Sequence, residues 1–332
     1  MQLLQQFSRS KRIAIISHAR PDADAIGSTL ALGFALEQFN GENTMITMLN
    51  HDEIPERYYP LHHARLIHQP TDYYKPEDFD LIVSVDCATK KGLGSIMENW
   101  PVHINIDHHV PNPGYGVYNY VAPNYSSCCE YLYDLFFGHA FRCMISPKIA
   151  DALLLGMIGD TGNFRYPGVT ANTFAALHTL VTLGGDPVKV ADIERQMDLV
   201  TAQAVTRIMG DGLVWSPKIA FLEIPLIEYM RMLGGKVDFV RLKSCVLEQM
   251  LLASETKLAC VLTWVDNHKV IGSLRAKEPL DVNTFARENF GGGGHKLAAG
   301  FQVDVDDRDF VTTFRHVTLK NFVDNTPKGV TI

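Results

Sequence analysis

The pattern of apolar runs and polar segments along the chain predicts alternating strands and helices. Short, mainly apolar runs have the length of buried strands at four places: 13–17, 44–49, 81–85 and 102–106. Helical periodicity follows at 25–39 and again at 144–159, where Pro147 suits the first helical turn. Buried strands that alternate with helices predict an α/β fold whose parallel sheet is covered on both faces.

The later part of the chain has a different pattern and predicts a second domain. A polar helical stretch at 188–209 follows the turn residues Gly184–Pro187, and a strand-rich region comes next. Further strands are expected at 257–266 and 269–274. A chain of 332 residues is long for one core. We therefore expect an N-terminal parallel-sheet domain, a helical linker and a smaller α/β domain, at 1–186, 187–210 and 211–332.

Composition and charge narrow the classes of function. The formal net charge of −7 does not favour a duplex-DNA-binding surface, which is usually basic. No apolar stretch approaches the roughly 20 residues of a membrane span, and the N-terminus lacks the apolar region of a signal peptide. The six cysteines have no zinc-ligand spacing and are expected to be buried thiols. A cytoplasmic protein without a membrane partner is expected.

The first cluster of functional residue types follows the first predicted strand. His18, Asp22 and Asp24 lie in one loop that leads into a helix. Two carboxylates held close together repel each other unless a cation lies between them. Hard divalent ions bind such oxygens, and an added imidazole shifts the preference toward manganese or a similar transition metal. A helix-capping aspartate beside a surface histidine would leave the same residues, so this loop alone keeps both interpretations open.

Two more predicted strands end in polar side chains. Asp86 follows one, and Asp107, His108 and His109 follow the next. Functional groups gather at the carboxyl edge of a parallel sheet, so we expect these residues to lie near the first loop. Neighbouring residues at a strand end point in opposite directions. The two histidines should therefore differ in role, one as a metal ligand and one facing a substrate phosphate, with Asp107 orienting an imidazole. Taken alone, Asp86 also fits a loop cap.

A carboxylate is also predicted where the long apolar helix ends. Asp160 lies between Gly159 and Thr161, and Gly162 follows. Glycine stop signals are typical of a helix C-terminus. An aspartate is unfavourable there because the negative end of the helix dipole repels it. A metal partner therefore explains Asp160 better than a helix stop does.

The C-terminal part contains a run of four glycines at 291–294, followed by His295 and Lys296. Backbone N–H groups in such a run can hold phosphate or carboxylate oxygens, and the two basic residues add donors. Flexible linkers are glycine-rich too. A linker would seldom lead directly into His-Lys and a helix of small residues, which we expect after Lys296. The run therefore predicts an anion-binding loop.

Taken in order, these elements resemble the DHH phosphoesterase superfamily with a DHHA1 domain. The order His-x-x-x-Asp-x-Asp, strand-end Asp, Asp-His-His and Gly-Asp-Thr-Gly is similar to that superfamily's metal motifs. The run Gly-Gly-Gly-Gly-His-Lys-x-Ala-Ala-Gly resembles the DHHA1 nucleic-acid-binding loop, so the resemblance covers roughly 13–302. By length the chain is similar to the stand-alone oligoribonucleases, or nanoRNases, which also act on 3′-phosphoadenosine 5′-phosphate.

This resemblance implies a role for each matching residue. One metal would be held by His18, Asp22 and Asp86. A second would be held by Asp24, Asp86, His108 and Asp160, with Asp86 as the bridge. His109 would contact the scissile phosphate, and Asp107 would be the other catalytic residue. The substrate would be bound by Arg275, Gly292, Gly293, Gly294, His295 and Lys296. The implied cofactors are two divalent ions, Mn²⁺ first, with Mg²⁺ or Co²⁺ as alternatives.

The implied activity is hydrolysis of short single-stranded oligonucleotides to mononucleotides by a water activated between the two metals. The resemblance extends to 3′-phosphoadenosine 5′-phosphate as a substrate and to a homodimer. Three alternatives stay open. The same core could act on pyrophosphate, polyphosphate or linear dinucleotides such as pGpG and pApA. A non-enzymatic nucleotide-binding regulator should have lost ligands. A metal-stabilised structural protein should have a closed site rich in Cys or His.

Overall fold

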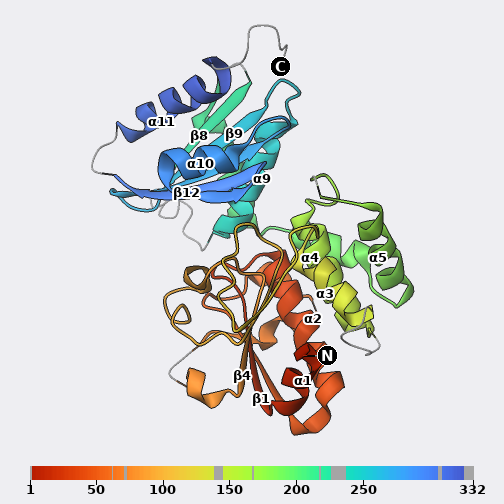
Figure 1. Cartoon of the computed structure of the whole chain (residues 1–332). Helices are drawn as coiled ribbons and strands as arrows, with labels where there is room; N and C mark the ends of the chain where they lie inside the picture. The colour runs from red at the N-terminus through yellow and green to blue at the C-terminus, as the bar shows by residue number, and fades with distance from the viewer. Residues whose placement is uncertain are drawn as a thin grey trace. The chain divides into compact units, whose positions relative to one another are not determined.

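The computed structural model describes the chain except for residues 1, 62, 71–72, 138–144, 167, 217, 226–236, 306–308 and 325–332. It divides into two units, Met1–Gln196 and Met197–Ile332, and each contains a six-stranded sheet (Figure 1). None of the helices in the described ranges has the length and apolar character needed to cross a membrane.

The N-terminal unit is built on a parallel sheet with the order β3-β2-β1-β4-β5-β6. Its strands are β1 (Arg12–Ile16), β2 (Met45–Leu49), β3 (Ile67–His68), β4 (Leu81–Val85), β5 (Ile104–Asp107) and β6 (Tyr118–Val121). The predicted α/β fold with a parallel sheet is therefore confirmed. The two edge strands β3 and β6 are short and were not predicted by the apolar pattern.

Both faces of this sheet are buried. In β1, Ile13 and Ile15 belong to the helix-covered core, whereas Ala14 and Ile16 belong to a separate apolar cluster on the other face. That second cluster includes Leu93 of a short 3-10 helix, Lys90–Leu93, and none of its described residues comes from a long helix. The helices of the unit are α1 (Gln2–Arg9), α2 (Ala23–Asn40), α3 (Cys128–Phe137), α4 (Pro147–Asp160), α5 (Ala171–Thr182) and α6 (Pro187–Arg195).

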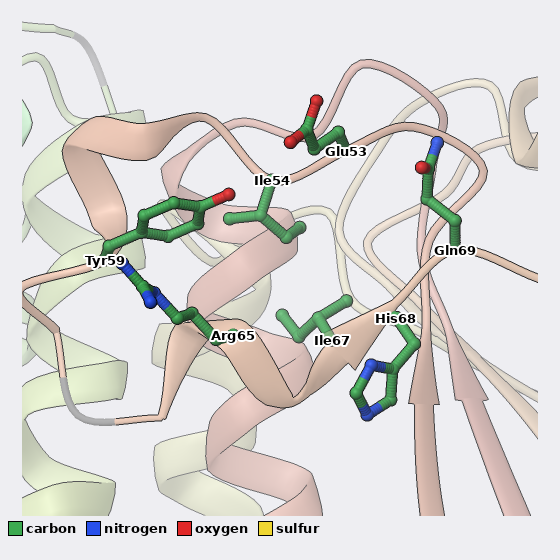
Figure 2. A pocket seen from close by; sticks show the side chains of 7 residues that line it. All are labelled: Glu53, Ile54, Tyr59, Arg65, Ile67, His68 and Gln69. Atoms are coloured by element: carbon green, nitrogen blue, oxygen red, sulfur yellow. The ribbon is translucent and has the colours of Figure 1, made fainter.

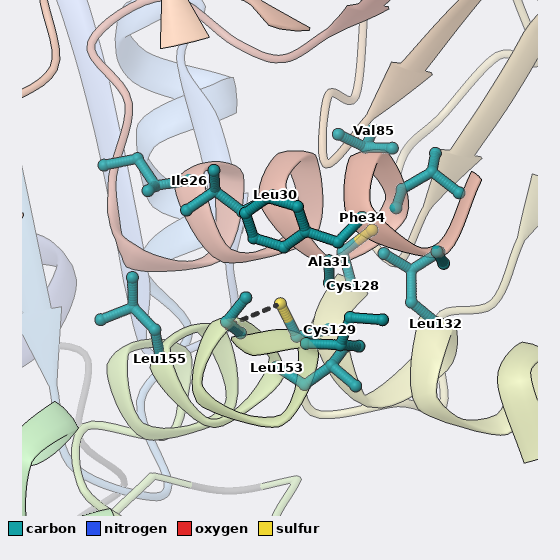
Figure 3. Packing of buried hydrophobic residues seen from close by; sticks show 14 of the residues in the cluster. Ile26, Leu30, Ala31, Phe34, Val85, Cys128, Cys129, Leu132, Leu153 and Leu155 are labelled. Carbon is teal, nitrogen blue, oxygen red and sulfur yellow. Dashed lines mark hydrogen bonds between the residues drawn. The ribbon is translucent and has the colours of Figure 1, made fainter. Parts of the chain in front are cut away.

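Helices α2 and α4 approach each other closely through glycines. A Cβ atom added at Gly27 of α2 would lie 2.4 Å from the carbonyl oxygen of Ala152 in α4. One added at Gly156 of α4 would lie 2.3 Å from Oδ1 of Asp24. Figure 3 shows the apolar side chains around this contact, including Leu30 of α2. The close approach brings the start of α2 and the end of α4 together.

The C-terminal unit contains a mixed sheet with the order β11-β12-β10-β9-β8-β7. Only β8 and β9 pair in parallel among its described strands. The strands are β7 (Leu213–Ser216), β8 (Ile219–Pro225), β9 (Leu258–Trp264), β10 (Lys269–Ala276), β11 (Gly293–His295) and β12 (Ala298–Asp304). The helices are α7 (Leu199–Gly212), α9 (Phe239–Leu252), α10 (Val282–Phe290) and α11 (Phe310–Leu319).

The prediction of a helix of small residues after Lys296 is wrong, because the segment forms strand β12. Its buried residues Ala299 and Phe301 alternate with less buried ones, which is the period of a strand. Small side chains here permit a strand between two neighbours as well as a helix, and the pairing with β10 and β11 decides between them.

The segment 187–210, predicted as a linker, consists of α6 and most of α7. Val190 and Ile193 of α6 are buried in the N-terminal core, whereas Ala204 and Ile208 of α7 are buried in a core of the C-terminal unit. The described cysteines are buried, apart from the half-buried Cys245; Cys143 lies outside the described residues.

Candidate metal centre

The carboxyl edge of the N-terminal sheet collects the polar residues predicted for that unit. The loop after β1 carries His18 and leads into α2, and Asp86 follows β4 directly. The end of β5 supplies Asp107, His108 and His109, and the end of α4 supplies Asp160. Three groups of these side chains have ligand atoms close enough to share a cation, all within 4.8 Å of one another in each group.

The first group consists of His18, Asp22 and Asp86. Nε2 of His18 lies 3.5 Å from Oδ1 of Asp22 and 3.5 Å from Oδ2 of Asp86. The other ring nitrogen, Nδ1, donates to the carbonyl oxygen of Ala19 at 2.9 Å. In the neutral ring this leaves the lone pair on Nε2, facing the two carboxylates. Asp22 also caps α2 by accepting from the backbone N–H of Asp24 and Ala25. The helix-cap interpretation and the ligand interpretation are therefore both compatible with its position.

The second group consists of Asp24, His108 and Asp160. Nε2 of His108 lies 3.7 Å from Oδ2 of Asp24 and 3.1 Å from Oδ2 of Asp160. Its Nδ1 donates to the carbonyl oxygen of Tyr125 at 3.2 Å. Asp24 and His108 are almost completely buried, whereas the side chain of Asp160 is 26% exposed. The group is therefore open to solvent on the Asp160 side.

Asp86 lies between the two groups. Its Oδ2 faces His18, and its Oδ1 lies 3.6 Å from both His108 Nε2 and His109 Nδ1. Within the described parts of the chain, Oδ1 is buried and receives no hydrogen bond. The backbone at Asp86 has a φ of +51°, a conformation that costs a non-glycine residue energy and is found mostly at functional sites.

His109 is held by a different carboxylate. Its Nδ1 donates to Oδ1 of Asp107 at 2.8 Å, and Asn112 donates to Oδ2 of Asp107 at 2.7 Å. The expectation that the two histidines point in opposite directions is wrong. Their ring centroids are 4.5 Å apart, and both rings face Asp86. Strand β5 ends at Asp107, so the alternation of a strand no longer governs the next two residues.

Burial and mutual repulsion shift the pKa values within the centre. Burial and the charges of Asp86 and Asp160 raise the pKa of Asp24 well above its ordinary value. Burial alone would lower the pKa of His108, but the hydrogen bond to Asp160 and the surrounding carboxylates raise it well above the usual range. Protons therefore relieve the carboxylate repulsion in the metal-free protein, a role that a divalent cation would take over.

The sequence did not reveal the groups that hold Asp24. At the start of α3, the backbone N–H of Cys128 donates to Oδ2 of Asp24 at 2.6 Å and that of Cys129 donates to Oδ1 at 3.0 Å. The carboxylate thus lies at the positive end of a helix. Almost every residue type has a backbone N–H group, so the sequence contains no pattern that identifies this contact.

A second unpredicted support comes from the segment after β2. Asn50 is completely buried and donates to the carbonyl oxygen of His18 at 2.9 Å. Asp52 accepts from the backbone N–H of Arg20 at 2.6 Å. Arg20 has a φ of +57°, so this contact fixes the unusual turn that returns the loop toward Asp22. In the sequence, this support could have been inferred from the polar run Asn50-His51-Asp52, which directly follows a strand.

The donor set fits divalent cations. Each of the first two groups combines an imidazole nitrogen with carboxylate oxygens, as expected for manganese-like ions rather than for a thiolate-bound structural zinc. The buried Oδ1 of Asp86 and the two histidines held by backbone carbonyls agree with this fit. The centre can therefore hold a divalent metal.

The predicted substrate-binding residues lie together in the C-terminal unit. Arg275 of β10 and His295 of β11 each pair with Ala298 of β12, which lies between them. Directly opposed residues point to the same face of a sheet, so Arg275 and His295 flank a small residue on one face. Nζ of Lys296 lies 2.9 Å from Oε2 of Glu278.

Local structure accounts for three of the four glycines. Gly291 has a φ of +66° and ends α10. A Cβ atom at Gly292 would lie 2.2 Å from the carbonyl oxygen of Gly300, and Gly294 has a φ of +147°. At Gly293, an added Cβ would meet Oδ1 of Asn283 at the ordinary contact distance of 3.7 Å, and no other contact within 4 Å is found among the described residues. The run therefore has a structural role, and its role as an anion-binding loop stays a prediction.

Comparisons with known proteins agree with this architecture. The N-terminal domain of the DHH family matches residues 12–157, and the DHHA1 domain matches residues 233–316. The chain is 26% identical to the probable bifunctional oligoribonuclease and PAP phosphatase NrnA of Streptococcus mutans, over 90% of this chain and 91% of that protein. It is 27% identical to the bifunctional oligoribonuclease and PAP phosphatase NrnA of Thermus thermophilus, over 87% and 83% of the two chains.

Among solved structures, an exopolyphosphatase-related protein from Bacteroides fragilis is similar with a TM-score of 0.83. The match covers 96% of this chain and 95% of that chain at 22% identity, and it shows that the fold is shared.

Proposed function

Since this chain is a DHH-family phosphoesterase with a DHHA1 domain, and hence a hydrolase of ester bonds, we propose that it cleaves short single-stranded oligonucleotides to mononucleotides. The proposal includes removal of the 3′-phosphate from 3′-phosphoadenosine 5′-phosphate. It is supported by relatives that are named for both activities and match over most of their length. The cofactors would be two divalent cations, Mn²⁺ first, with Mg²⁺ or Co²⁺ as alternatives.

The position of Asp86 carries this proposal. One of its oxygens faces the group with His18, and the other faces the group with His108. A carboxylate that offers one oxygen to each of two donor groups is what a pair of neighbouring cations requires. His18, Asp22 and Asp86 would hold one cation. The other would be held by Asp24, Asp86, His108 and Asp160.

The bound cations would supply positive charge for the phosphoryl oxygens and a lowered pKa for the attacking water. The side chains of the protein would then orient the reacting groups and donate a proton. Asp107 holds Nδ1 of His109. Burial lowers the pKa of His109, but the hydrogen bond to Asp107 and the charges of Asp86 and Asp107 together raise it above its ordinary value. The ring can thus carry a proton on Nε2 and donate it to a phosphoryl or leaving oxygen. The N–H groups of Cys128 and Cys129 fix the carboxylate of Asp24, which would help to hold the second cation.

In the C-terminal unit, Arg275 and the loop 292–296 would bind the substrate. Arg275 and His295 lie two strands apart on one face of the sheet, roughly 10 Å from backbone to backbone, with only Ala298 between them. Such a row leaves room for a phosphate group between two basic side chains, and an arginine can contact it with two hydrogen bonds. Gly293 carries no side chain, and even an added Cβ would make only an ordinary contact there, so an anion could approach the backbone closely.

The test uses the full chain, freed of metal by a chelator and then supplied with Mn²⁺. We expect release of mononucleotides from a 5′-phosphorylated RNA dinucleotide with Mn²⁺ and none with chelator. Asp86→Asn should lower kcat by at least about 10³-fold, because it removes a charge shared by both cations. Isothermal titration should show two Mn²⁺ sites in the parent and a defect at both in the variant. Glu42→Gln is an exposed carboxylate-to-amide control and should behave like the parent.

Two outcomes would overturn the proposal. Full activity of a folded Asp86→Asn variant would exclude the shared-carboxylate arrangement. A metal-loaded parent that cleaves pyrophosphate but neither the dinucleotide nor 3′-phosphoadenosine 5′-phosphate would keep the metal centre and refute the nucleotide substrates.

A further inference from the structure

A pocket of about 380 Å³ lies at the carboxyl edge of the N-terminal sheet, beside strands β2 and β3. Figure 2 shows Tyr59 and Arg65 on one side of it, His68 and Gln69 on the other, and isoleucine side chains between them. The complete lining consists of Glu53, Ile54, Tyr59, Arg65, Ile67, His68 and Gln69.

Hydrogen bonds through the segment after β2 link the pocket to the loop after β1, which carries part of the metal centre. Strand β2 lies between β3 and β1, so the pocket is displaced sideways from His18 by about two strand spacings, or roughly 10 Å. The two regions are hydrogen-bonded to each other. Asn50 donates to the carbonyl oxygen of His18, Asp52 accepts from the N–H of Arg20, and Gln69 donates to the carbonyl oxygen of His51, at 2.9, 2.6 and 3.3 Å. The sugar and base of one nucleotide can span such a displacement.

The lining combines an apolar floor with a flat aromatic and cationic wall. Ile54 and Ile67 are buried, with 4% and 7% of their surface exposed. The guanidinium carbon of Arg65 lies 4.4 Å from the centroid of the Tyr59 ring. Among the residues that the structure describes, Arg65 forms no ion pair with a carboxylate. Its charge is therefore available to a ligand, and the carboxylate of Glu53 lines the same pocket.

We propose that this pocket binds the base and ribose of the nucleotide next to the scissile phosphate. The base would lie over Ile54 and Ile67, against the Tyr59–Arg65 pair, because bases stack on aromatic rings and on guanidinium planes. Arg65 would donate to a ring nitrogen or carbonyl of the base. Glu53 would accept from the exocyclic amino group of adenine, guanine or cytosine, which uracil lacks. This inference rests on the proposed function and specifies which part of the substrate the N-terminal unit recognises.

The same chemistry argues against an inorganic occupant. Pyrophosphate or polyphosphate would gain nothing from the apolar floor and would be repelled by the carboxylate of Glu53. A site for such anions should be lined by several cations, whereas Arg65 is the one lining residue with a permanent positive charge. The pocket is thus suited to a nucleoside.

The experiment measures binding of AMP and of inorganic phosphate to the Mn²⁺-loaded full chain by isothermal titration. Tyr59→Leu keeps apolar volume but removes the ring, and Arg65→Gln removes the charge. Both variants should weaken AMP binding by about 5- to 150-fold, the range for loss of one stacked base, and leave phosphate binding unchanged. Arg9→Gln, on an exposed residue of α1, is the matched control for Arg65→Gln. In the parent, UMP should bind more weakly than AMP, and Glu53→Gln should reduce that difference.

Each result decides the matter. Equal affinities of AMP and phosphate in the parent, or parental AMP affinity in both variants, would overturn the pocket assignment. If Tyr59→Leu fails to fold in a thermal scan, the exposed Arg65 still reports through Arg65→Gln. Dinucleotide hydrolysis is followed in parallel. If the parent binds AMP more tightly than phosphate but does not hydrolyse the dinucleotide, the proposed function is refuted and the pocket assignment stands. If it hydrolyses the dinucleotide but shows no preference for AMP, the pocket assignment is refuted and the proposed function stands.

Discussion

One methyl group added at Gly156 should disrupt the metal centre from the side of helix α4. Gly156 lies in α4, and its Cα faces the start of both α2 and α3. In Gly156→Ala the new Cβ would lie 2.3 Å from Oδ1 of Asp24 and 2.3 Å from Sγ of Cys129. Ordinary contacts of this kind are 3.4–4 Å long, so a neighbour must move by more than 1 Å. Movement of Asp24 would strain its hydrogen bonds to α3.

The expected change in unfolding free energy follows from one stabilising and two destabilising effects. Alanine stabilises a helix interior by about 1 kcal/mol relative to glycine. Overpacking of a filled core costs about 1–3 kcal/mol. Weakening a hydrogen bond to the charged carboxylate of Asp24 costs about 1.5–3 kcal/mol more. We therefore expect the N-terminal unit to lose about 1.5–5 kcal/mol of unfolding free energy, from the sum of these values. Its affinity for Mn²⁺ should fall at least tenfold, which corresponds to about 1.4 kcal/mol.

The assay combines hydrogen exchange of peptides from α2 and α4 with Mn²⁺ titration. Regional exchange is needed because a chain of two units does not have a single free energy of unfolding. Gly210→Ala is the matched control. Gly210 lies in α7 and is exposed, and an added Cβ would meet nothing within 4 Å among the described residues. The control should gain up to about 1 kcal/mol and bind Mn²⁺ like the parent. Equal stability and equal Mn²⁺ affinity of Gly156→Ala and the parent would refute the reasoning.

Four further outcomes are expected. Mn²⁺ at about 100 times the Kd of each site should stabilise the N-terminal unit in hydrogen exchange by about 2.7 kcal/mol for each ion bound and leave the C-terminal unit unchanged; equal protection of both units would contradict this. Asn50→Ala should cost about 1–3 kcal/mol by leaving the carbonyl of His18 without its donor, and hydrogen exchange of peptides from the N-terminal unit measures the difference between parent and variant. Asp107→Asn should lower the pKa of His109 in an NMR titration, because the hydrogen bond and charge of Asp107 raise it. In the parent, the raised pKa of His109 stabilises the metal-free fold fully at pH values below the ordinary pKa of about 6.5. This stabilisation is lost as the pH rises from that value through the raised pKa. The variant should therefore lose less stability than the parent over the same pH range. Gly292→Ala should disrupt the pairing of β11 with β12, seen as faster amide exchange there, whereas Gly293→Ala should preserve it; the reverse order would refute the packing account.

Much of the fold could be predicted because burial on both faces leaves a clear trace in the chain. The run Leu81–Val85 is apolar apart from Ser84, and it coincides with β4. The edge strand β3 has only two residues, Ile67 and His68, and its pairing with β2 defines it rather than its composition. Strand β12 was mistaken for a helix because Ala298, Ala299 and Gly300 are compatible with either period until neighbouring strands pair with them.

The sequence by itself determined the order of the central strands β1, β2, β4 and β5 and of the helices α2 and α4. It also determined the chemical types at their ends, including the histidines and aspartates of the centre. It could do so because apolar periodicity and ligand type are properties of single residues and their spacing. Only the tertiary structure decided that Asp86 presents one oxygen to each donor group, that the N–H groups of Cys128 and Cys129 hold Asp24, and that Asn50 supports His18. These contacts join residues up to 105 positions apart, in part through backbone atoms, and depend on parallel strands placing their carboxyl ends along one edge.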